Sequence, residues 1–306
     1  MEDIYDAIER LKKERNAVIL AHVYQPDEIQ EIADFCGDSF ALSQKAANTD
    51  ADVIVFCGVR FMAETANILS PQKITLLPAA DATCRMFDHT LEARVKAALK
   101  EHPEYKVVSY VNSPASVKAL SEICCTSSNA VEVIESLPKD MEILFVPDMD
   151  LASFTAEQTN HHIIPWKGAC PTHFNLTVED VKKAKEAHPE ALVLMHPECR
   201  PEVRALADYI GSTMGIVKYA EQSDQDSFII ATECGVMYQL TERCPHKHFY
   251  MASGDLLCPN MKKTTLELVK KSLETLEPRI VVPEDIRVKA YDALQKMLAI
   301  TGEASK

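Results

Sequence analysis

Short runs of consecutive apolar residues recur along this chain, and a helical pattern follows each run. Residues 17–21 read Ala-Val-Ile-Leu-Ala, and after a polar turn residues 27–35 place Ile29 and Ile32 on one helical face. Residues 53–57 read Val-Ile-Val-Phe-Cys and also lead into a helix. Strands that are apolar at every position, rather than at alternate positions, are typical of parallel sheets covered by helices on both faces. The pattern therefore predicts an α/β protein.

The same order of elements occurs three times along the chain. Each copy has an apolar strand, a polar turn with proline, an amphipathic helix, and a loop of small residues that opens a second helix. The prolines of the three turns are Pro26, Pro114 and Pro201, which lie 88 and 87 residues apart. A unit of this length is too long for a solenoid repeat and suits a small three-layer α/β domain.

Each copy is expected to contribute three strands to its sheet. The first helices are predicted at 27–35, 115–123 and 202–210, the small-residue loops at 36–39, 124–127 and 211–213, and the third strands at 73–79, 162–166 and 248–251. The prediction is three similar αβα domains with parallel sheets around a pseudo-threefold axis.

The predicted domains span residues 1–84, 85–170 and 171–260. The tail, 261–306, has a mostly helical pattern and is expected to pack on the first domain. Ligands of parallel α/β sheets bind beyond the carboxyl ends of the strands. With three such domains, the shared site is expected where the three sets of strand ends face one another.

Composition and charge narrow the range of partners. The 306 residues are 47% hydrophobic and 25% charged, which is ordinary for a globular protein large enough to hold several cores. The formal net charge of −14 argues against nucleic acid, because an acidic chain repels phosphate backbones. The apolar runs are too short to span a bilayer, and the acidic start does not read as a signal peptide. We therefore expect a cytoplasmic protein with small-molecule substrates and no membrane partner.

The repeat also sorts the ten cysteines, which in a reducing compartment are free thiols or metal ligands rather than disulfides. Cys84, Cys170 and Cys258 each follow the third strand of a copy by a short loop, with separations of 86 and 88 residues. No other three cysteines recur in this way. The remaining seven are expected to pack as small apolar residues or to line the site without binding a metal.

Three cysteines at one axis are compatible with more than one cofactor. A 4Fe–4S cluster held by three thiolates keeps one iron open, and this iron can bind substrate oxygen or nitrogen as a Lewis acid. A zinc ion would need a fourth ligand, which His173 could supply. The third alternative is a chance alignment of loop cysteines. Of the three, we predict the cluster.

Polar side chains gather at equivalent positions of the three copies. The first strand of each copy ends in one of the pairs His22 and Tyr24, Tyr110 and Asn112, or His196 and Glu198. The second helix of each copy opens at Asp38-Ser39, Thr126-Ser127 or Ser212-Thr213. Any single member could serve only a turn or a helix cap. Three helix N-termini that point inward would instead attract an anion such as a dicarboxylate or a phosphate ester.

Several longer motifs resemble those of quinolinate synthases, and together they cover nearly the whole chain in order. They are Ala21-His22-Val23-Tyr24-Gln25-Pro26, Tyr110-Val111-Asn112-Ser113, Gly168-Ala169-Cys170-Pro171-Thr172-His173, His196-Pro197-Glu198-Cys199, Gly211-Ser212-Thr213, Ala231-Thr232-Glu233-Cys234-Gly235 and Cys258-Pro259-Asn260-Met261. The resemblance implies condensation of iminoaspartate with dihydroxyacetone phosphate to quinolinate, phosphate and water. It also implies a 4Fe–4S cluster on Cys84, Cys170 and Cys258, and a hand-over of iminoaspartate from an aspartate-oxidising enzyme.

The resemblance further assigns residues to the substrates. Those expected to bind substrate are His22, Ser39, Tyr110, Val111, Asn112, Ser127, His173, His196, Pro197, Glu198, Ser212 and Thr213. The expected catalytic residues are Tyr24, Glu198, Tyr110 and His22, with Tyr24 and Glu198 as acid–base groups and His173 at the phosphate-bearing partner. Two rival hypotheses are an iron–sulfur hydro-lyase of another substrate and a zinc-stapled scaffold without activity.

Overall fold

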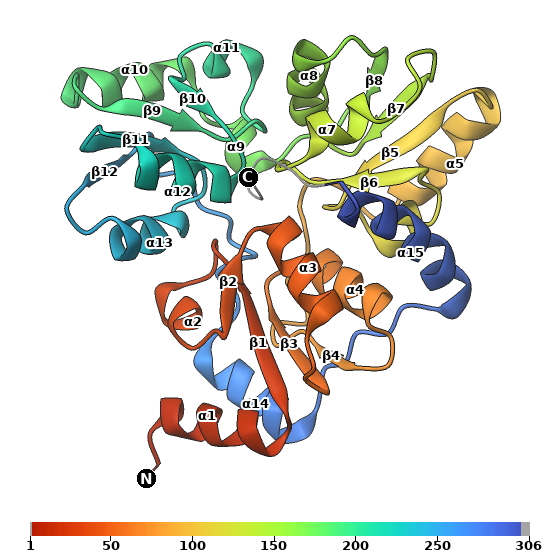
Figure 1. The fold of residues 1–306 in the computed structure, drawn as a ribbon, viewed down its shortest axis with the longest axis vertical. Helices are drawn as coiled ribbons and strands as arrows, with labels where there is room; N and C mark the ends of the chain where they lie inside the picture. Colours follow the sequence, from red (N-terminus) through yellow and green to blue (C-terminus); the bar gives the residue numbers. More distant parts are fainter. Residues whose placement is uncertain (1, 301–306) are drawn as a thin grey trace.

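Three four-stranded sheets with flanking helices surround a common centre (Figure 1). The computed structural model describes residues 2–300. All strand pairs of the three sheets are parallel, and the strand orders are β2-β1-β3-β4, β6-β5-β7-β8 and β10-β9-β11-β12. The order is therefore the same in each sheet, with the first strand between the second and third. The prediction of three similar αβα domains with parallel sheets is confirmed.

The first domain shows why its strands are apolar throughout. Its elements are α1 (Ile4–Glu14), β1 (Ala17–His22), α2 (Asp27–Glu31), β2 (Phe35–Gly37), α3 (Ser39–Asn48), β3 (Val53–Cys57), α4 (Arg60–Leu69) and β4 (Ile74–Leu76). Ile19 of β1 packs in the same apolar cluster as Leu11 of α1, whereas Leu20 packs with Phe40 of α3. Successive side chains of a strand point to opposite faces, so helices on both faces bury β1 from Val18 to His22.

The second and third domains repeat this arrangement. The second contains α5 (Leu91–Glu101), β5 (Lys106–Tyr110), α6 (Ala115–Lys118), β6 (Ile123–Cys125), α7 (Ala130–Glu135), β7 (Ile143–Val146), α8 (Met149–Gln158) and β8 (Ile163–Pro165). The third contains α9 (Pro171–Phe174), α10 (Val178–Ala187), β9 (Leu192–Met195), α11 (Pro201–Arg204), β10 (Tyr209–Ile210), α12 (Thr213–Gln222), β11 (Ser227–Ala231), α13 (Val236–Arg243) and β12 (His248–Met251). The central strands β1, β5 and β9 are thus equivalent.

The sequence prediction was wrong about the edge of each sheet, which has a fourth strand where the sequence suggested the end of a helix or the start of the following loop. The helices α2, α6 and α11 are four or five residues long. The apolar residues after them form the short strands β2, β6 and β10 beside the central strands. A strand of two or three residues is too short to show a period of its own, so the pattern merged it with the preceding helix.

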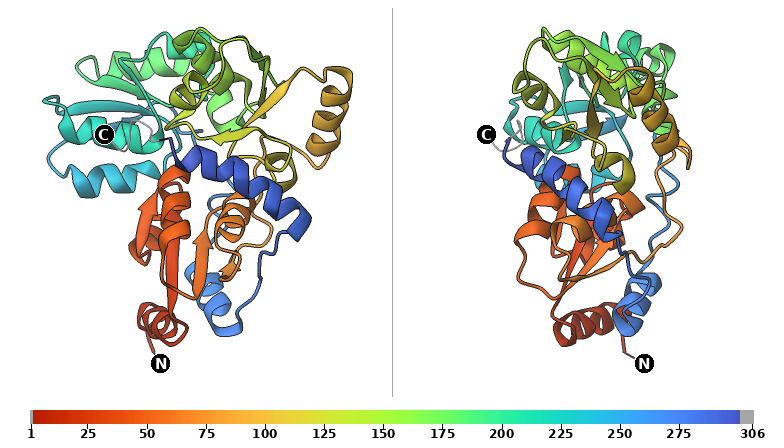
Figure 2. Two further views of the ribbon diagram at one scale, coloured as in Figure 1. Left: turned by 45° about the vertical axis from the view of Figure 1, so that its right-hand side comes forward. Right: turned by 90° about the vertical axis from the view of Figure 1, so that its right-hand side faces the viewer.

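Two helices of the C-terminal segment lie against different domains (Figure 2). The first, α14 (Leu266–Thr275), packs against α1 and β3 of the first domain. The second, α15 (Glu284–Leu298), packs against β6 and α6 of the second domain and against α4 of the first. Its residues Ala290 and Leu294 are fully buried. Between residues 2 and 300, no helix is both long and apolar enough to cross a membrane.

Candidate functional site

A cavity lies where the three domains meet. Thirteen of the residues singled out from the sequence line it: His22, Tyr24, Ser39, Cys84, Tyr110, Asn112, Ser127, Cys170, His173, His196, Glu198, Thr213 and Cys258. They follow strands of all three sheets, as expected for ligand sites of parallel α/β sheets. The fold therefore brings together residues that are up to 236 positions apart in the chain.

Three predicted substrate-binding residues do not line the cavity. Val111 is buried in the apolar core, and its N–H donates to the carbonyl of Cys125. Ser212 is the N-cap of α12, where its hydroxyl accepts the N–H of Gly215. Pro197 presents its carbonyl to the buried Arg204, with the Nη1 and oxygen 3.4 Å apart. Each of the three supports a neighbouring residue that does reach the cavity.

The predicted inward-pointing helix ends occur in the first and third domains but differ in the second. Asp38 caps α3 and Ser212 caps α12, so that Ser39 and Thr213 occupy the first helical positions beside the cavity. In the second domain α7 begins only at Ala130, after a turn in which Thr126 donates to Asn129. Ser127 thus reaches the cavity from a turn and not from a helix N-terminus.

Two histidines at strand ends have the same local geometry. The Nδ1 atom of His22 accepts the N–H of Tyr24 at 3.1 Å, and the Nδ1 atom of His196 accepts the N–H of Glu198 at 3.3 Å. An acceptor nitrogen carries no proton, so the neutral ring of each histidine is protonated on Nε2. Burial lowers the pKa of both side chains to about 3. Both histidines are therefore neutral hydrogen-bond donors at pH 7.

This burial makes a prediction for the pH dependence of stability. His22 has a pKa of about 3 in the folded chain and 6.5 as its ordinary value, so only the unfolded chain binds a proton there at pH 5. The folded state is therefore not disfavoured by His22 above pH 6.5, and it loses stability relative to the unfolded chain as the pH falls below this value. When the pH is lowered from 7 to 5, the free energy of unfolding is expected to decrease by about 2 kcal/mol more in wild type than in His22→Asn. The difference arises because the amide of asparagine does not titrate. Anaerobic urea unfolding at both pH values measures the difference, and equal losses would contradict the assignment.

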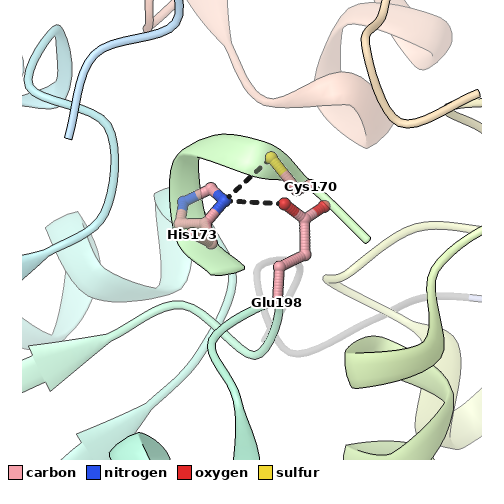
Figure 3. A group of neighbouring side chains, drawn as sticks. All are labelled: Cys170, His173 and Glu198. Atoms are coloured by element: carbon pink, nitrogen blue, oxygen red, sulfur yellow. Dashed lines mark hydrogen bonds and ion pairs between the residues drawn. The ribbon is translucent and has the colours of Figure 1, made fainter. Parts of the chain in front are cut away.

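His173 and Glu198 are in close contact in the cavity (Figure 3). The Nδ1 atom of His173 lies 2.7 Å from Oε2 of Glu198 and 3.3 Å from Sγ of Cys170. One ligand atom from each of these three residues lies within 4.8 Å of the others, so the group could hold a metal ion. Burial opposes ionisation of Glu198, but the imidazoles of His196 and His173 outweigh it and hold the pKa of its carboxyl at about 2.

A chain of hydrogen bonds connects Glu198 with Tyr24. The Nε2 atom of His173 lies 2.9 Å from the hydroxyl of Thr232, which lies 2.7 Å from the hydroxyl of Tyr24. Tyr24 also contacts the hydroxyl of Thr213 at 2.7 Å. Sequence reasoning had no role for Thr232 beyond its place in a motif, because a fully buried threonine after a strand looks like an ordinary core residue.

The two tyrosines of the cavity stay protonated at neutral pH. Burial, reinforced by the negative charge of Glu198, raises the pKa of both Tyr24 and Tyr110 well above 10. The cavity therefore combines the ionised carboxylate of Glu198 with two phenols that can donate protons or hydrogen bonds. Groups whose environments separate their pKa values in this way are suited to general acid–base catalysis.

The three predicted cysteines are the only ones of the ten that line the cavity. Burial raises the pKa of Cys84 to about 12 and also raises that of Cys170 and Cys258. Thiols in such surroundings stay neutral by themselves and ionise when a metal binds. One thiol from each domain at a shared cavity is a donor set that fits a three-cysteine iron–sulfur cluster.

Two buried carboxylates hold the backbone of the cysteine loops, and neither was assigned from the sequence. Asp148 follows β7 and accepts the N–H of Cys170 at 3.0 Å. Glu233 follows β11 and accepts the N–H of Cys258 at 3.0 Å. The equivalent position of the first domain carries no carboxylate, and the carbonyl of Thr83 accepts a hydrogen bond from Asn260 instead.

A buried arginine holds the turn that carries Glu198. Arg204 donates from Nη1 to the carbonyls of Pro197 and Cys199, which flank Glu198, and to the carbonyl of Asp150 in α8. Its Nη2 forms an ion pair with Glu157 at 2.7 Å. The position of Glu198 thus depends on contacts between the second and third domains.

The fold and the site define a class of protein: a three-domain α/β enzyme whose buried titratable side chains and three thiols share one cavity. Comparison with known proteins identifies the family. The model of the family described as "Quinolinate synthetase A protein" matches residues 6–299. The chain belongs to this family.

Curated relatives agree along their full length. The chain is 52% identical over 298 residues to "Quinolinate synthase 1" of Methanosarcina acetivorans, which covers 97% of this chain and 98% of the relative. It is also 52% identical over 302 residues to "Quinolinate synthase" of Caldicellulosiruptor saccharolyticus, covering 98% and 99%. The protein of the same name from Geobacter metallireducens is 52% identical over 299 residues, covering 98% of each chain. The function supported is that of a quinolinate synthase, an enzyme of NAD biosynthesis.

Proposed function

We propose that this chain condenses iminoaspartate with dihydroxyacetone phosphate to form quinolinate, with release of phosphate and two waters. We also propose that it does so with a 4Fe–4S cluster on Cys84, Cys170 and Cys258. The observation that carries the proposal is that these three thiols line the same cavity as the hydrogen-bonded chain from Glu198 to Tyr24. When bound, the cluster would supply one iron without a thiolate ligand, a Lewis acid for a substrate hydroxyl or carboxylate.

The side chains around the cavity divide into groups that bind and groups that move protons. His22 and His196 are neutral and donate from Nε2, which suits the carboxylates of the dicarboxylic substrate. Ser39, Ser127 and Thr213 add hydroxyl donors from all three domains. These assignments follow from protonation state and position in the cavity.

Glu198 and Tyr24 are the proposed acid–base pair. Glu198 is ionised and close to His173, so it can accept a proton from a substrate carbon. Tyr24 is protonated and can return a proton along the chain through Thr232 and His173. We assign His173 to the phosphate-bearing substrate, which its position in the cavity supports. Tyr110 would orient the substrate beside Glu198.

Two further proposals concern the cellular setting. Iminoaspartate is an imine that water hydrolyses, so we propose that an aspartate-oxidising enzyme hands it over directly. The many free cysteines of the chain suit a reducing compartment, which supports a cytoplasmic location.

The test begins with anaerobic purification. A brown protein with about four irons and labile sulfide per chain is expected, whereas a colourless protein with one zinc would favour the scaffold hypothesis. The second step supplies iminoaspartate and dihydroxyacetone phosphate and measures quinolinate by chromatography. A clustered protein that makes no quinolinate would instead favour a hydro-lyase of another substrate.

Asp148→Asn is expected to reduce iron retention to less than about half that of wild type. Asparagine can still cap α8 through Oδ1, but its amide group would then face the N–H of Cys170, where the carboxylate now accepts. Iron per chain after gel filtration is the measurement. Asp150→Asn is the matched control, because this neighbouring carboxylate makes no contact with the cysteine loops, and full iron retention in Asp148→Asn would contradict the role of the carboxylate.

A further inference from the structure

A second hollow, here called the side pocket, adjoins the main cavity. Its lining residues are Arg85, Met86, Phe87, Asp88, Leu91, Arg94, Trp166, Lys167 and Gly168. They come from the loop after Cys84, the start of α5 and the loop that leads from β8 to Cys170. Arg85 and Met86 line both hollows, so the side pocket borders the main cavity.

The side pocket concentrates positive charge on an otherwise acidic protein. Arg85, Arg94 and Lys167 are exposed, and within residues 2–300 none of them forms an ion pair. The guanidinium of Arg94 lies 5.0 Å from the centroid of the Trp166 ring, which fixes one wall. The acidic member of the lining is Asp88, and Oδ1 of its carboxylate accepts hydrogen bonds from the N–H and the hydroxyl of Thr90. The pocket thus has three cations against one carboxylate in a chain of net charge −14.

The main cavity has the opposite balance. Its lining includes the acidic residues Asp38, Glu198 and Glu233, and Arg85 is the permanently charged cation that lines it. Lys262 approaches from behind but is paired with Glu233 at 3.0 Å. A doubly charged phosphoryl group that enters such a cavity would lose its hydration without gaining fixed positive partners. Cations at the border of the cavity would supply them.

We propose that the side pocket is a binding site for a phosphoryl dianion, through which the phosphate-bearing substrate reaches the cavity beside Cys84. Arg94 and Lys167 would hold the phosphoryl oxygens, since a planar guanidinium and an ammonium both suit phosphate. Arg85, which borders both hollows, would pass the group to the main cavity. The identity of the ester rests on the proposed function, but binding of the anion does not. Inorganic phosphate released by the reaction presents the same chemistry and would leave by the same site.

The chain offers its own probe for this site, because Trp166 is its single tryptophan. Inorganic phosphate and dihydroxyacetone phosphate are titrated separately into the clustered enzyme at constant ionic strength, and tryptophan fluorescence is recorded. We expect a saturable change that is weakened at least about tenfold in the double variant Arg94→Gln, Lys167→Gln. Lys100→Gln is the matched control, since it removes one exposed cation from the same helix, away from the pocket. Tighter binding of the ester identifies the substrate as the source, and equal or tighter binding of phosphate identifies the product.

A kinetic measurement separates phosphate binding by Arg94 and Lys167 from a merely structural role, because only the former changes the KM of one substrate and not of the other. In the double variant the KM for dihydroxyacetone phosphate is expected to rise at least about tenfold, while the KM for iminoaspartate stays within about twofold of wild type. No saturable fluorescence change, or the same change in wild type and double variant, would overturn the proposal. If wild type makes no quinolinate at all, the proposed function fails, and the fluorescence titration still decides the anion site.

Discussion

Replacing Cys84 by alanine is expected to remove nearly all iron from the protein and to abolish quinolinate formation. Cys84 is the thiol that the first domain contributes to the cavity, and a cluster left with two protein thiolates is not held. Cys244→Ala is expected to leave iron content and activity within about twofold of wild type. Cys244 is also buried, but it ends α13 and does not line the cavity.

The two variants are compared by iron and sulfide content, by the visible spectrum and by quinolinate formation, all under anaerobic conditions. Circular dichroism checks that Cys84→Ala keeps its secondary structure, so that cluster loss can be separated from misfolding. Equal loss of iron in the two variants would refute the assignment of the cluster to the three repeat-related cysteines. Loss of activity with full iron in Cys84→Ala would place the cluster elsewhere.

The second large effect is expected for Glu198→Gln, which should keep the cluster and lower turnover by about 10²–10⁴-fold. Glutamine has nearly the same shape as glutamate and its oxygen can still accept from Nδ1 of His173. It cannot take up a proton at neutral pH, so general-base catalysis is lost while the geometry is retained. Arg204 continues to hold the turn through the carbonyls of Pro197 and Cys199.

Iron content and single-turnover quinolinate formation are measured side by side for this variant. Glu190→Gln serves as the control, because Glu190 lies in the same domain, is exposed and is absent from the cavity. Activity equal to that of wild type would show that Glu198 moves no proton. Loss of iron together with activity would show that the carboxylate supports the thiol site instead.

The sequence was sufficient for the architecture of each domain because burial on both faces requires apolar residues at every position of a central strand. The apolar runs 18–21 of β1 and 193–195 of β9 show this requirement directly, and repetition of the pattern at about 87 residues revealed three domains. It also limited ten cysteines to three. The spacing of Cys84, Cys170 and Cys258 reflects equivalent loops, and equivalent loops of related domains lie at equivalent places around an axis.

Contacts between residues that are far apart in the chain could not be predicted from the sequence. Thr232 links His173 to Tyr24, and Asp148 supports Cys170, but neither residue type is unusual after a buried strand. The edge strands β2, β6 and β10 are recognisable only beside the central strands that they pair with. Arg204 looks like a surface cation in the sequence and is buried in the structure.

The amino-acid sequence by itself thus determined the α/β class, the threefold repeat, the family resemblance and the thiols and polar pairs at the strand ends. These features depend on local periodicity and on repetition, both of which are preserved in a linear string. Only the tertiary structure decided which donors meet which acceptors, which histidines are neutral and where unpaired cations gather. Those properties depend on burial and on distances between side chains from different domains. The side pocket is the clearest example, because Arg85, Arg94 and Lys167 become neighbours only when the loop after Cys84, helix α5 and the loop after β8 come together.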